Sequence, residues 1–345
     1  MPDAMNILIV KTSSLGDVLH ALPALTDAAR ALPASQVDWV VEESYAEIPS
    51  WHPAVTNIIP VAMRRWRKGL FTAQSLKEWR HTLGMLRASS YDIIIDAQGL
   101  LKSAVLAACA HGERHGFDRP SAREPLATLF YQRRHTVSRQ LHAVERLRRL
   151  FAAALGYDLP DGPVDYGLPP MESLTEQARG AYLVFLHGTV WRSKQWPEEY
   201  WCELTKVAAN AGLRVLLPAG NLEESERAHR IAAASNNAEV LPSMNLTQIA
   251  AILAGARGVV GVDTGLAHCA AALSVPAVTL YGATDPGLTG ALGRTQCYAR
   301  ADFACSPCLS RECNYRGRAK VSPACYETIP PSHVWKLLND LLASA

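Results

Sequence analysis

The chain has 345 residues, of which 49% are apolar and 19% charged, and its net charge is +2. This length is sufficient for two domains with full cores, and the composition excludes a largely disordered chain. No apolar run approaches the roughly 20 residues that span a bilayer, and no secretion signal precedes the first strand, so we expect a cytoplasmic protein. Its eight cysteines are then reduced thiols or metal ligands rather than a disulfide framework.

Predicted strands and helices alternate along the chain. The strand patterns cover residues 7–11, 37–42, 58–62 and 91–97 in the first half, and 182–187, 214–218, 239–241, 258–262 and 277–281 in the second. The helix patterns cover residues 18–32, 76–88, 143–155, 198–211, 223–235, 246–254 and 266–273. Such alternation predicts parallel sheets with helices on both faces.

A linker is predicted near the middle of the chain, where residues 157–170 hold four prolines and three aspartates. We therefore expect an α/β protein of two doubly wound, Rossmann-like domains, residues 1–165 and 166–345. The two domains are expected to face each other across a crevice that holds the ligands.

The turn between the first strand and the first helix, residues 11–17, reads Lys-Thr-Ser-Ser-Leu-Gly-Asp. In an open α/β sheet such a turn faces the ligand crevice, where backbone N–H groups can meet an anion and Asp17 a substrate hydroxyl. Asp17 can alternatively be a plain helix N-cap, and His20 is then the alternative residue to accept the proton of that hydroxyl. The glycines do not match G-x-G-x-x-G, so a dinucleotide site is not the first interpretation.

A second turn of this kind, residues 261–268, ends an apolar strand and opens a helix of small residues. Asp263 and Thr264 can cap that helix, and Gly265 lets a ligand approach the backbone. The free N–H groups of the helix suit a pyrophosphate. An Asp cap beside a structural glycine, with no ligand, is the alternative.

Two more turns in the second half carry charged side chains. Arg192 and Lys194 lie in the loop after residue 187, where they can meet phosphate charge. Glu224 lies in the first turn of a later helix, where an acid is more often a partner of the helix dipole than a ligand contact.

Positive charge is concentrated in residues 64–149, which hold 17 Lys or Arg and 7 Asp or Glu. The run Arg64-Arg65-Trp66-Arg67-Lys68 is its densest part. A basic segment suggests an acidic partner, and the absence of a nucleic-acid recognition motif favours an acidic substrate or an anionic membrane surface. The alternative is a solvated basic face without a partner.

Four cysteines lie in the tail, in the pattern Cys305-x2-Cys308-x4-Cys313-x11-Cys325. Four thiols at this spacing can hold Zn²⁺ tetrahedrally. The spacing differs from a standard zinc knuckle, so free thiols are preferred and a structural zinc is the alternative.

Several motifs together resemble one family. They are V-K-T-S-S-L-G-D-V-L-H-A-L-P-A-L, R-R-W-R-K, D-A-Q-G-L-L-K-S, A-R-E-P-L-A, K-Q-W-P-E-E, V-D-T-G-L-A-H and Y-G-A-T-D-P-G-L, spread over residues 5–296. In combination they resemble the ADP-heptose:lipopolysaccharide heptosyltransferases of glycosyltransferase family 9, and within it most closely the type I enzymes.

The resemblance implies a GT-B fold with the acceptor bound by the first domain and the nucleotide sugar by the second. It also implies an inverting transfer of L-glycero-D-manno-heptose from ADP-heptose to Kdo-lipid A, without metal or cofactor. The enzyme is then expected to be a monomer that lies peripherally on the cytoplasmic face of the inner membrane and binds no nucleic acid.

The resemblance also assigns residues. It makes Asp17 the general base and Lys194 the residue that grips the donor phosphate. The other donor-binding positions are Thr189, Glu224, Asp263, Thr264, Gly265 and His268. The acceptor-binding positions are Ser13, Ser14, Arg64, Arg65, Arg67 and Lys68.

Other functions remain open at this point. The cysteine tail is more similar to that of type II enzymes, which makes the first heptose an alternative acceptor. A nucleotide-sugar epimerase of the same fold would need no basic cluster, and a zinc-stabilised nucleotide-sensing module would release no ADP when acceptor is present.

Overall fold

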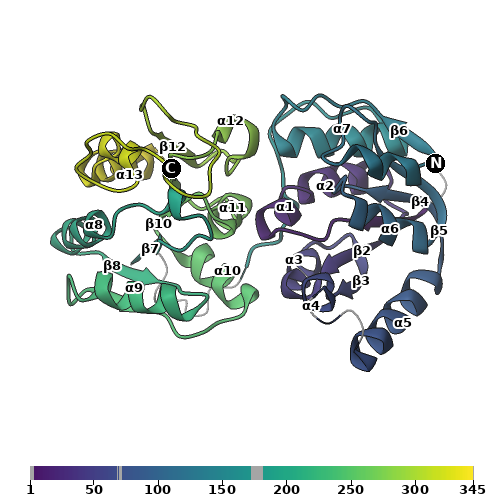
Figure 1. Cartoon of the computed structure of the whole chain (residues 1–345), viewed down its shortest axis with the longest axis horizontal. Coiled ribbons are helices and arrows are strands. Elements are labelled where there is room, and N and C mark those ends of the chain that lie inside the picture. Colours follow the sequence, from purple (N-terminus) through teal and green to yellow (C-terminus); the bar gives the residue numbers. More distant parts are fainter. Residues whose placement is uncertain (1–3, 68, 70–71, 172–181, 345) are drawn as a thin grey trace. The chain divides into compact units, whose positions relative to one another are not determined.

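The computed structural model describes residues 4–67, 69, 72–171 and 182–344, and the chain divides into two compact units. Unit 1 comprises Met1–Pro169 and unit 2 comprises Pro170–Ala345. The division therefore falls at residue 169, whereas the linker pattern places it at residue 165. Each unit contains one six-stranded sheet, and Figure 1 shows both sheets with their helices.

The sheet of unit 1 has the order β3-β2-β1-β4-β5-β6, with every neighbouring pair parallel. Its strands are β1 (Asn6–Val10), β2 (Gln36–Glu42), β3 (Val55–Val61), β4 (Ser90–Asp96), β5 (His111–Phe117) and β6 (Arg133–His135). The two central strands are buried along almost their whole length, because apolar residues cover both of their faces.

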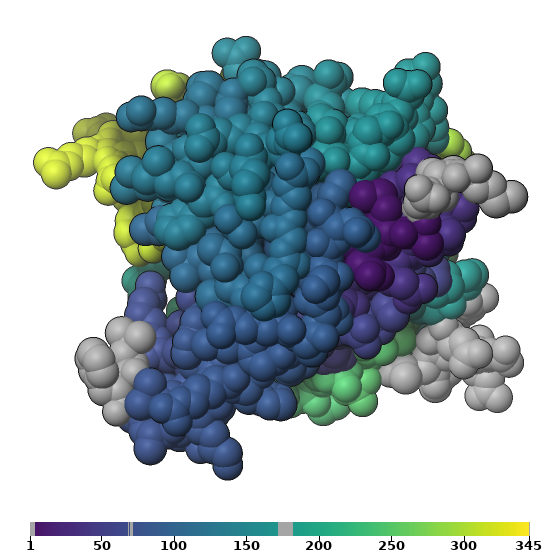
Figure 2. Space-filling view, turned by 90° about the vertical axis from the view of Figure 1, so that its right-hand side faces the viewer, coloured from purple at the N-terminus to yellow at the C-terminus, as the bar shows by residue number. Residues whose placement is uncertain are grey.

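The helices of unit 1 connect these strands. They are α1 (Leu15–Leu19), α2 (Leu22–Ala31), α3 (Glu47–Ser50), α4 (Met63–Trp66), α5 (Ala73–Arg87), α6 (Leu101–Cys109) and α7 (Ala143–Leu155), with short 3₁₀ turns η1 (Glu43–Tyr45) and η2 (Pro125–Phe130). Helix α7 packs on α2, and Gly156 ends it in the left-handed conformation with φ of 73°. Residues 64–149 form much of the face of unit 1 in Figure 2, in blue and teal.

The sheet of unit 2 has the order β12-β11-β10-β7-β8-β9, again parallel throughout. Its strands are β7 (Tyr182–Leu186), β8 (Arg214–Leu217), β9 (Ala238–Val240), β10 (Gly258–Val262), β11 (Ala277–Tyr281) and β12 (Gln296–Arg300). Counted from the start of each unit, both sheets have the strand order 3-2-1-4-5-6 of a doubly wound fold. The two units therefore share one topology.

The helices of unit 2 pack around a core that includes Phe185 and Trp201. They are α8 (Glu198–Asn210), α9 (Leu222–Ala232), α10 (Leu246–Gly255), α11 (Gly265–Ala272), α12 (Pro286–Thr289) and α13 (Pro331–Ser344), with the 3₁₀ turns η4 (Arg192–Lys194) and η5 (Ala324–Thr328). Within the described ranges, none of the helices is long and apolar enough to cross a membrane.

The structure differs from the predicted elements in two ways. The single helix expected at residues 18–32 is two helices, because α1 begins at Leu15 and ends at Leu19, and α2 begins at Leu22 with Pro23 in its first turn. Proline has no N–H and cannot continue a preceding helix, but it fits a first turn. The patterns also missed strands β5, β6 and β12, the longer helices α6 and α13, and the four-residue helices α3, α4 and α12.

Candidate active site

The candidate functional residues gather at one edge of each sheet. In both units the strand order reverses between the first and fourth strands, and ligands of doubly wound folds bind outside the carboxyl ends of the strands at such a reversal. In unit 1 this place lies between the ends of β1 and β4, and in unit 2 between the ends of β7 and β10. The turns singled out from the sequence follow β1, β7 and β10.

Asp17 lies in the turn after β1 and is half-buried. Its Oδ2 accepts hydrogen bonds from the backbone N–H of Ser14 at 2.7 Å and from the Ser14 hydroxyl at 3.1 Å. Ser14 is the N-cap of α1 and Asp17 is the third residue of the helix, so the interpretation of Asp17 as the N-cap is wrong. Both of these hydrogen bonds fall on Oδ2, and neither involves Oδ1.

The turn after β4 supports the turn after β1. The side-chain oxygen of Gln98 accepts hydrogen bonds from the backbone N–H groups of Thr12 and Ser13, both at 3.2 Å. Asp96 in turn accepts a hydrogen bond from the backbone of Gln98 at 2.9 Å and one from the Tyr131 hydroxyl at 2.6 Å. This network fixes the backbone that carries Ser14 and Asp17.

Two lysines at this turn, Lys11 and Lys102, are further candidates that the sequence analysis did not single out. Lys11 is buried and donates from Nζ to the backbone oxygen of Ala97 at 2.9 Å. Burial lowers the pKa of Lys11, and the negative charges of Asp17 and Asp96 oppose that shift. Lys102 donates to the Ser13 hydroxyl at 3.4 Å. The signal for both was present, because each lies in a motif on which the family resemblance depends.

The basic cluster begins at α4, which follows β3 at the same edge of the sheet. Arg65 forms ion pairs with Glu43 at 3.0 Å and Glu78 at 2.7 Å, so its charge is largely compensated within unit 1. Arg64 lies over the Tyr45 ring at 5.2 Å, and Arg67 is exposed. Arg64 and Arg67 are therefore better placed than Arg65 to meet an acidic ligand. Lys68 lies outside the described residues.

The candidate site of unit 2 is built around a buried carboxylate, Asp263, at the end of β10. Lys194 Nζ lies 2.6 Å from Asp263 Oδ2, which also accepts a hydrogen bond from the Thr284 hydroxyl at 2.6 Å. His268 Nε2 lies 3.7 Å from Asp263 Oδ1. Burial raises the pKa of Asp263, but the hydrogen bond with His268 and the charge of Lys194 outweigh burial and hold this pKa well below its usual range.

These contacts overturn one interpretation. Asp263 does not cap α11, because its carboxylate is bound to Lys194 and Thr284. The N-cap is Thr264, whose side chain makes no capping hydrogen bond, and Gly265 is the first helical residue. Helix α11 therefore begins without a side chain over its first N–H groups, the arrangement to which a phosphate can bind.

Thr189 and Glu224 lie around the same place. The Thr189 hydroxyl donates to the backbone oxygen of Asp263 at 3.3 Å. Glu224 receives a hydrogen bond from the backbone of Gly220 at 2.8 Å, and its carboxylate approaches so close to Gly188 that a Cβ there would lie 2.6 Å from it. Glu224 thus lies in the first turn of α9, and its carboxylate packs against the loop after β7.

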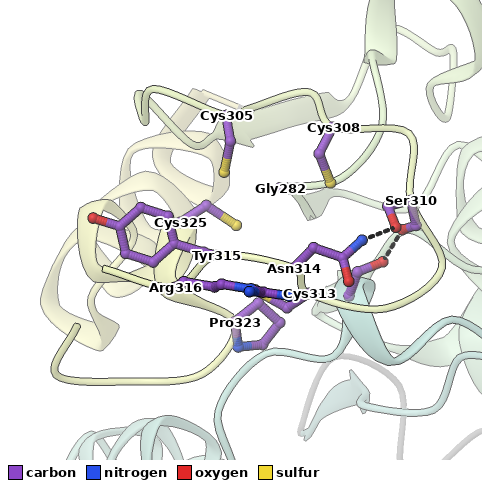
Figure 3. A pocket seen from close by; sticks show the side chains of 11 residues that line it. Gly282, Cys305, Cys308, Ser310, Cys313, Asn314, Tyr315, Arg316, Pro323 and Cys325 are labelled. Carbon is purple, nitrogen blue, oxygen red and sulfur yellow. Dashed lines mark hydrogen bonds between the residues drawn. The ribbon is translucent and has the colours of Figure 1, made fainter. Parts of the chain in front are cut away.

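The four tail cysteines line one cavity of about 320 Å³ in unit 2, together with Ser193 and Gly282 (Figure 3). Three of the thiols are exposed and Cys325 is buried. Burial raises the pKa of Cys325 to about 12, and the other three thiols act in the same direction. Among the described residues, no group of three or more His, Cys, Asp or Glu side chains is placed to hold a metal ion.

Two doubly wound units with the strand order 3-2-1-4-5-6 give the chain a GT-B type fold, the fold of the heptosyltransferase structure that it matches. The chain belongs to glycosyltransferase family 9, the heptosyltransferase family, whose sequence model matches residues 79–318.

The similarity to known members extends over nearly the whole chain. Lipopolysaccharide heptosyltransferase 1 of Pseudomonas aeruginosa is 52% identical over 349 aligned positions, which cover 98% of both chains. The enzyme of the same name from Escherichia coli K12 is 53% identical over 300 positions, covering 86% of this chain and 94% of that one. The structure of E. coli heptosyltransferase WaaC with ADP has a TM-score of 0.86 and 46% identity and covers 98% of this chain and 100% of that chain. Lipopolysaccharide heptosyltransferase 2 of Salmonella typhimurium is 35% identical over only 103 positions, 28% of this chain, so the type II alternative is the less supported one.

Proposed function

We propose that this glycosyltransferase transfers heptose from ADP-heptose to the Kdo of Kdo-lipid A, in the inner core of lipopolysaccharide. The observation that carries the proposal is the pairing of Lys194 with Asp263 beside the uncapped start of α11. Asp263 occupies one of the three N–H donors of the Lys194 ammonium, so the other donors and the backbone N–H groups of α11 are offered to a diphosphate. The names of the relatives, and the ADP in the WaaC structure, support heptose and adenosine diphosphate as the parts of the donor.

The proposed reaction is a single displacement at the anomeric carbon. The acceptor hydroxyl attacks that carbon and its proton passes to Asp17, while the bond to ADP breaks and the electron pair leaves with the diphosphate. Asp17 Oδ2 is held by Ser14, so Oδ1 is the oxygen proposed to take the proton. Attack opposite to the leaving group inverts the configuration.

Leaving-group stabilisation is assigned to Lys194 and the first N–H groups of α11, with no metal in the reaction. A preorganised cation and backbone dipoles can stabilise a departing diphosphate without further reorganisation. We therefore expect EDTA to leave turnover unchanged. Full loss of turnover in EDTA, restored by Mg²⁺ or Mn²⁺, would contradict this part of the mechanism.

The acceptor is assigned to unit 1. Ser13, Ser14, Arg64 and Arg67 present hydroxyls and positive charge, and Kdo-lipid A carries carboxylates and phosphates. Such an acceptor lies in a membrane, so we propose a peripheral contact of a monomeric enzyme with the cytoplasmic face of the inner membrane.

A coupled ADP-release assay tests the function. With ADP-heptose as donor, we expect ADP release with Kdo-lipid A and little release with the product that already carries the first heptose. Preference for the heptosylated product would instead identify a type II acceptor. Equal ADP release with and without acceptor would contradict transfer.

A further inference from the structure

Lys194 lies in a loop with little regular secondary structure. It is the last residue of η4, a turn of three residues with two hydrogen bonds, from Lys194 N to the Trp191 oxygen and from Gln195 N to the Arg192 oxygen. Lys194 Nζ also contacts Asp263 and lies 4.5 Å from the centre of the Trp191 ring. Further support for the loop comes from residues 303–326, here named the cysteine segment. This segment follows β12 and contains all four tail cysteines.

The cysteine segment contacts η4 through three hydrogen bonds. Ser193 donates from its backbone N to the Arg311 oxygen at 3.1 Å and from its hydroxyl to the Ser310 oxygen at 2.5 Å. The Tyr326 hydroxyl donates to the backbone oxygen of Lys194 at 2.8 Å. Ser193 and Tyr326 are both buried, so water does not compete freely for these bonds.

The same segment also holds the other side of the Lys194–Asp263 pair. The Ser306 hydroxyl donates to the Gly282 oxygen at 2.6 Å, and Leu309 N donates to the Ala283 oxygen at 2.8 Å. Thr284 directly follows Ala283 in the chain, and its hydroxyl donates a hydrogen bond to Asp263. Both partners of the pair are thus connected to one segment.

We infer that the cysteine segment is a positioning element for Lys194, with Tyr326 and Ser193 as its positioning residues. The inference rests on the proposed function, because it takes Lys194 as the group that meets the donor diphosphate. A lysine that is already held in place loses less conformational freedom when the donor binds and needs less reorganisation when the diphosphate departs. Tyr326 and Ser193 therefore act on donor binding through Lys194 and touch no substrate.

The first test removes one hydroxyl. Tyr326→Phe keeps the packed ring and loses the bond to Lys194, and we expect ADP affinity to fall about 3- to 10-fold by calorimetry and kcat to fall with it. The KM for the acceptor should not change. The matched control is Tyr182→Phe, which loses a hydroxyl bond of 2.8 Å to the Ile252 oxygen. Tyr182 is the first residue of β7, at the opposite end of the strand from the loop that carries Lys194, so ADP affinity should stay within twofold.

The second test is a double-mutant cycle on ADP affinity. In the Lys194→Ala background, Tyr326→Phe should cause no further loss, because a residue that acts through Lys194 has nothing left to position. Additive losses would overturn the inference and leave the proposed function standing. Should Tyr326→Phe fail to fold, Ser193→Ala takes its place in the same cycle. Absence of ADP binding by the unmodified enzyme would overturn the proposed function and this inference together.

Discussion

At the scale of single residues, Asp17 owes its orientation to Ser14, which binds only one of its two carboxylate oxygens. Asp17→Asn keeps an acceptor for the Ser14 N–H but cannot accept a proton at neutral pH. We therefore expect kcat to fall about 10²- to 10⁴-fold while ADP affinity stays within twofold, as measured by ADP release and calorimetry. Asp17→Ala serves as the comparison, because it also removes the hydrogen bonds of the turn. Turnover near that of the unmodified enzyme in a folded Asp17→Asn variant would contradict the assignment.

Under the proposed function, the Lys194–Asp263 pair is expected to link donor binding to stability. The two side chains are only 16% and 8% exposed, so Lys194→Ala leaves a buried carboxylate without its cation. We expect roughly 3 kcal/mol loss in the free energy of unfolding, together with a 10- to 100-fold loss of ADP affinity. The double variant Lys194→Ala/Asp263→Asn should regain most of the stability but none of the affinity. Recovery of ADP affinity in the double variant would show that Lys194 does not meet the diphosphate.

The residue types and their places after strands were sufficient to predict Asp17, Lys194 and Asp263 as candidates. The partners of these residues were not predictable, because Thr284 and Lys194 reach Asp263 only through the tertiary fold. A local pattern favours capping for an aspartate before a helix, and here an ion pair from a distant loop competes successfully for the carboxylate. Roles assigned by resemblance remain predictions that the variants above test.

At the scale of elements, α2 and α7 are joined by a buried ion pair. Arg148 on α7 binds Asp27 on α2 at 2.6 Å, and both side chains are less than a tenth exposed. Breaking such a pair leaves one buried charge, so Arg148→Met should lower the free energy of unfolding by about 3–5 kcal/mol. Chemical denaturation measures the loss, and Arg148→Met/Asp27→Leu should recover much of it.

The matched control for this element is Arg149→Met, one position along the same helix. Arg149 pairs with Glu145 at 2.7 Å, but its side chain is 51% exposed, so this substitution should cost less than about 0.5 kcal/mol. Equal losses for the two arginines would show that burial does not determine the strength of the α2–α7 contact.

A regular apolar period made some elements predictable, although α6 and α13 were missed. Helix 143–155 was placed at its observed bounds because its apolar stripe is clear and a glycine follows it. The cysteine segment has no period, and its role depends on hydrogen bonds to η4 and to the turn after β11. Edge strands β6 and β9 have three residues each, and only β9 carries a pattern that the sequence revealed.

At the scale of the whole molecule, alternation of strands and helices predicted the two parallel sheets. It did not reveal that both units use the same strand order, because order follows from pairings between distant segments. The charge excess of residues 64–149 likewise overstated the basic site. Arg65, Arg148 and Arg149 are each paired with acids inside unit 1, which leaves fewer cations for a ligand.

Two of the buried histidines, His52 in unit 1 and His187 in unit 2, have a strongly lowered pKa. Burial lowers the pKa of each histidine from 6.5 to about 4. In His52 the negative charge of Asp165 opposes this shift but does not outweigh it. His52 Nδ1 accepts from Ala54 N at 3.2 Å, so a proton on this nitrogen would break that bond. Below pH 6.5 the unfolded chain therefore binds more protons than the folded one, and stability falls as the pH falls from 6.5 toward 4.

This linkage predicts acid sensitivity in both units. When the pH falls from 7.5 to 5, each histidine should lower the free energy of unfolding by about 2 kcal/mol, which corresponds to roughly 4–8 °C in Tm for a unit of this size. Carboxylates with lowered pKa, such as Asp165 and Asp263, stay ionised in this window and do not contribute. Scanning calorimetry across the window measures the slope, which His52→Asn should reduce because Asn keeps an acceptor for Ala54 N but does not titrate. The control is His111→Asn, a substitution at an exposed histidine, which should leave the slope unchanged. If the His52→Asn variant has the same slope as the unmodified protein, His52 is not the group responsible.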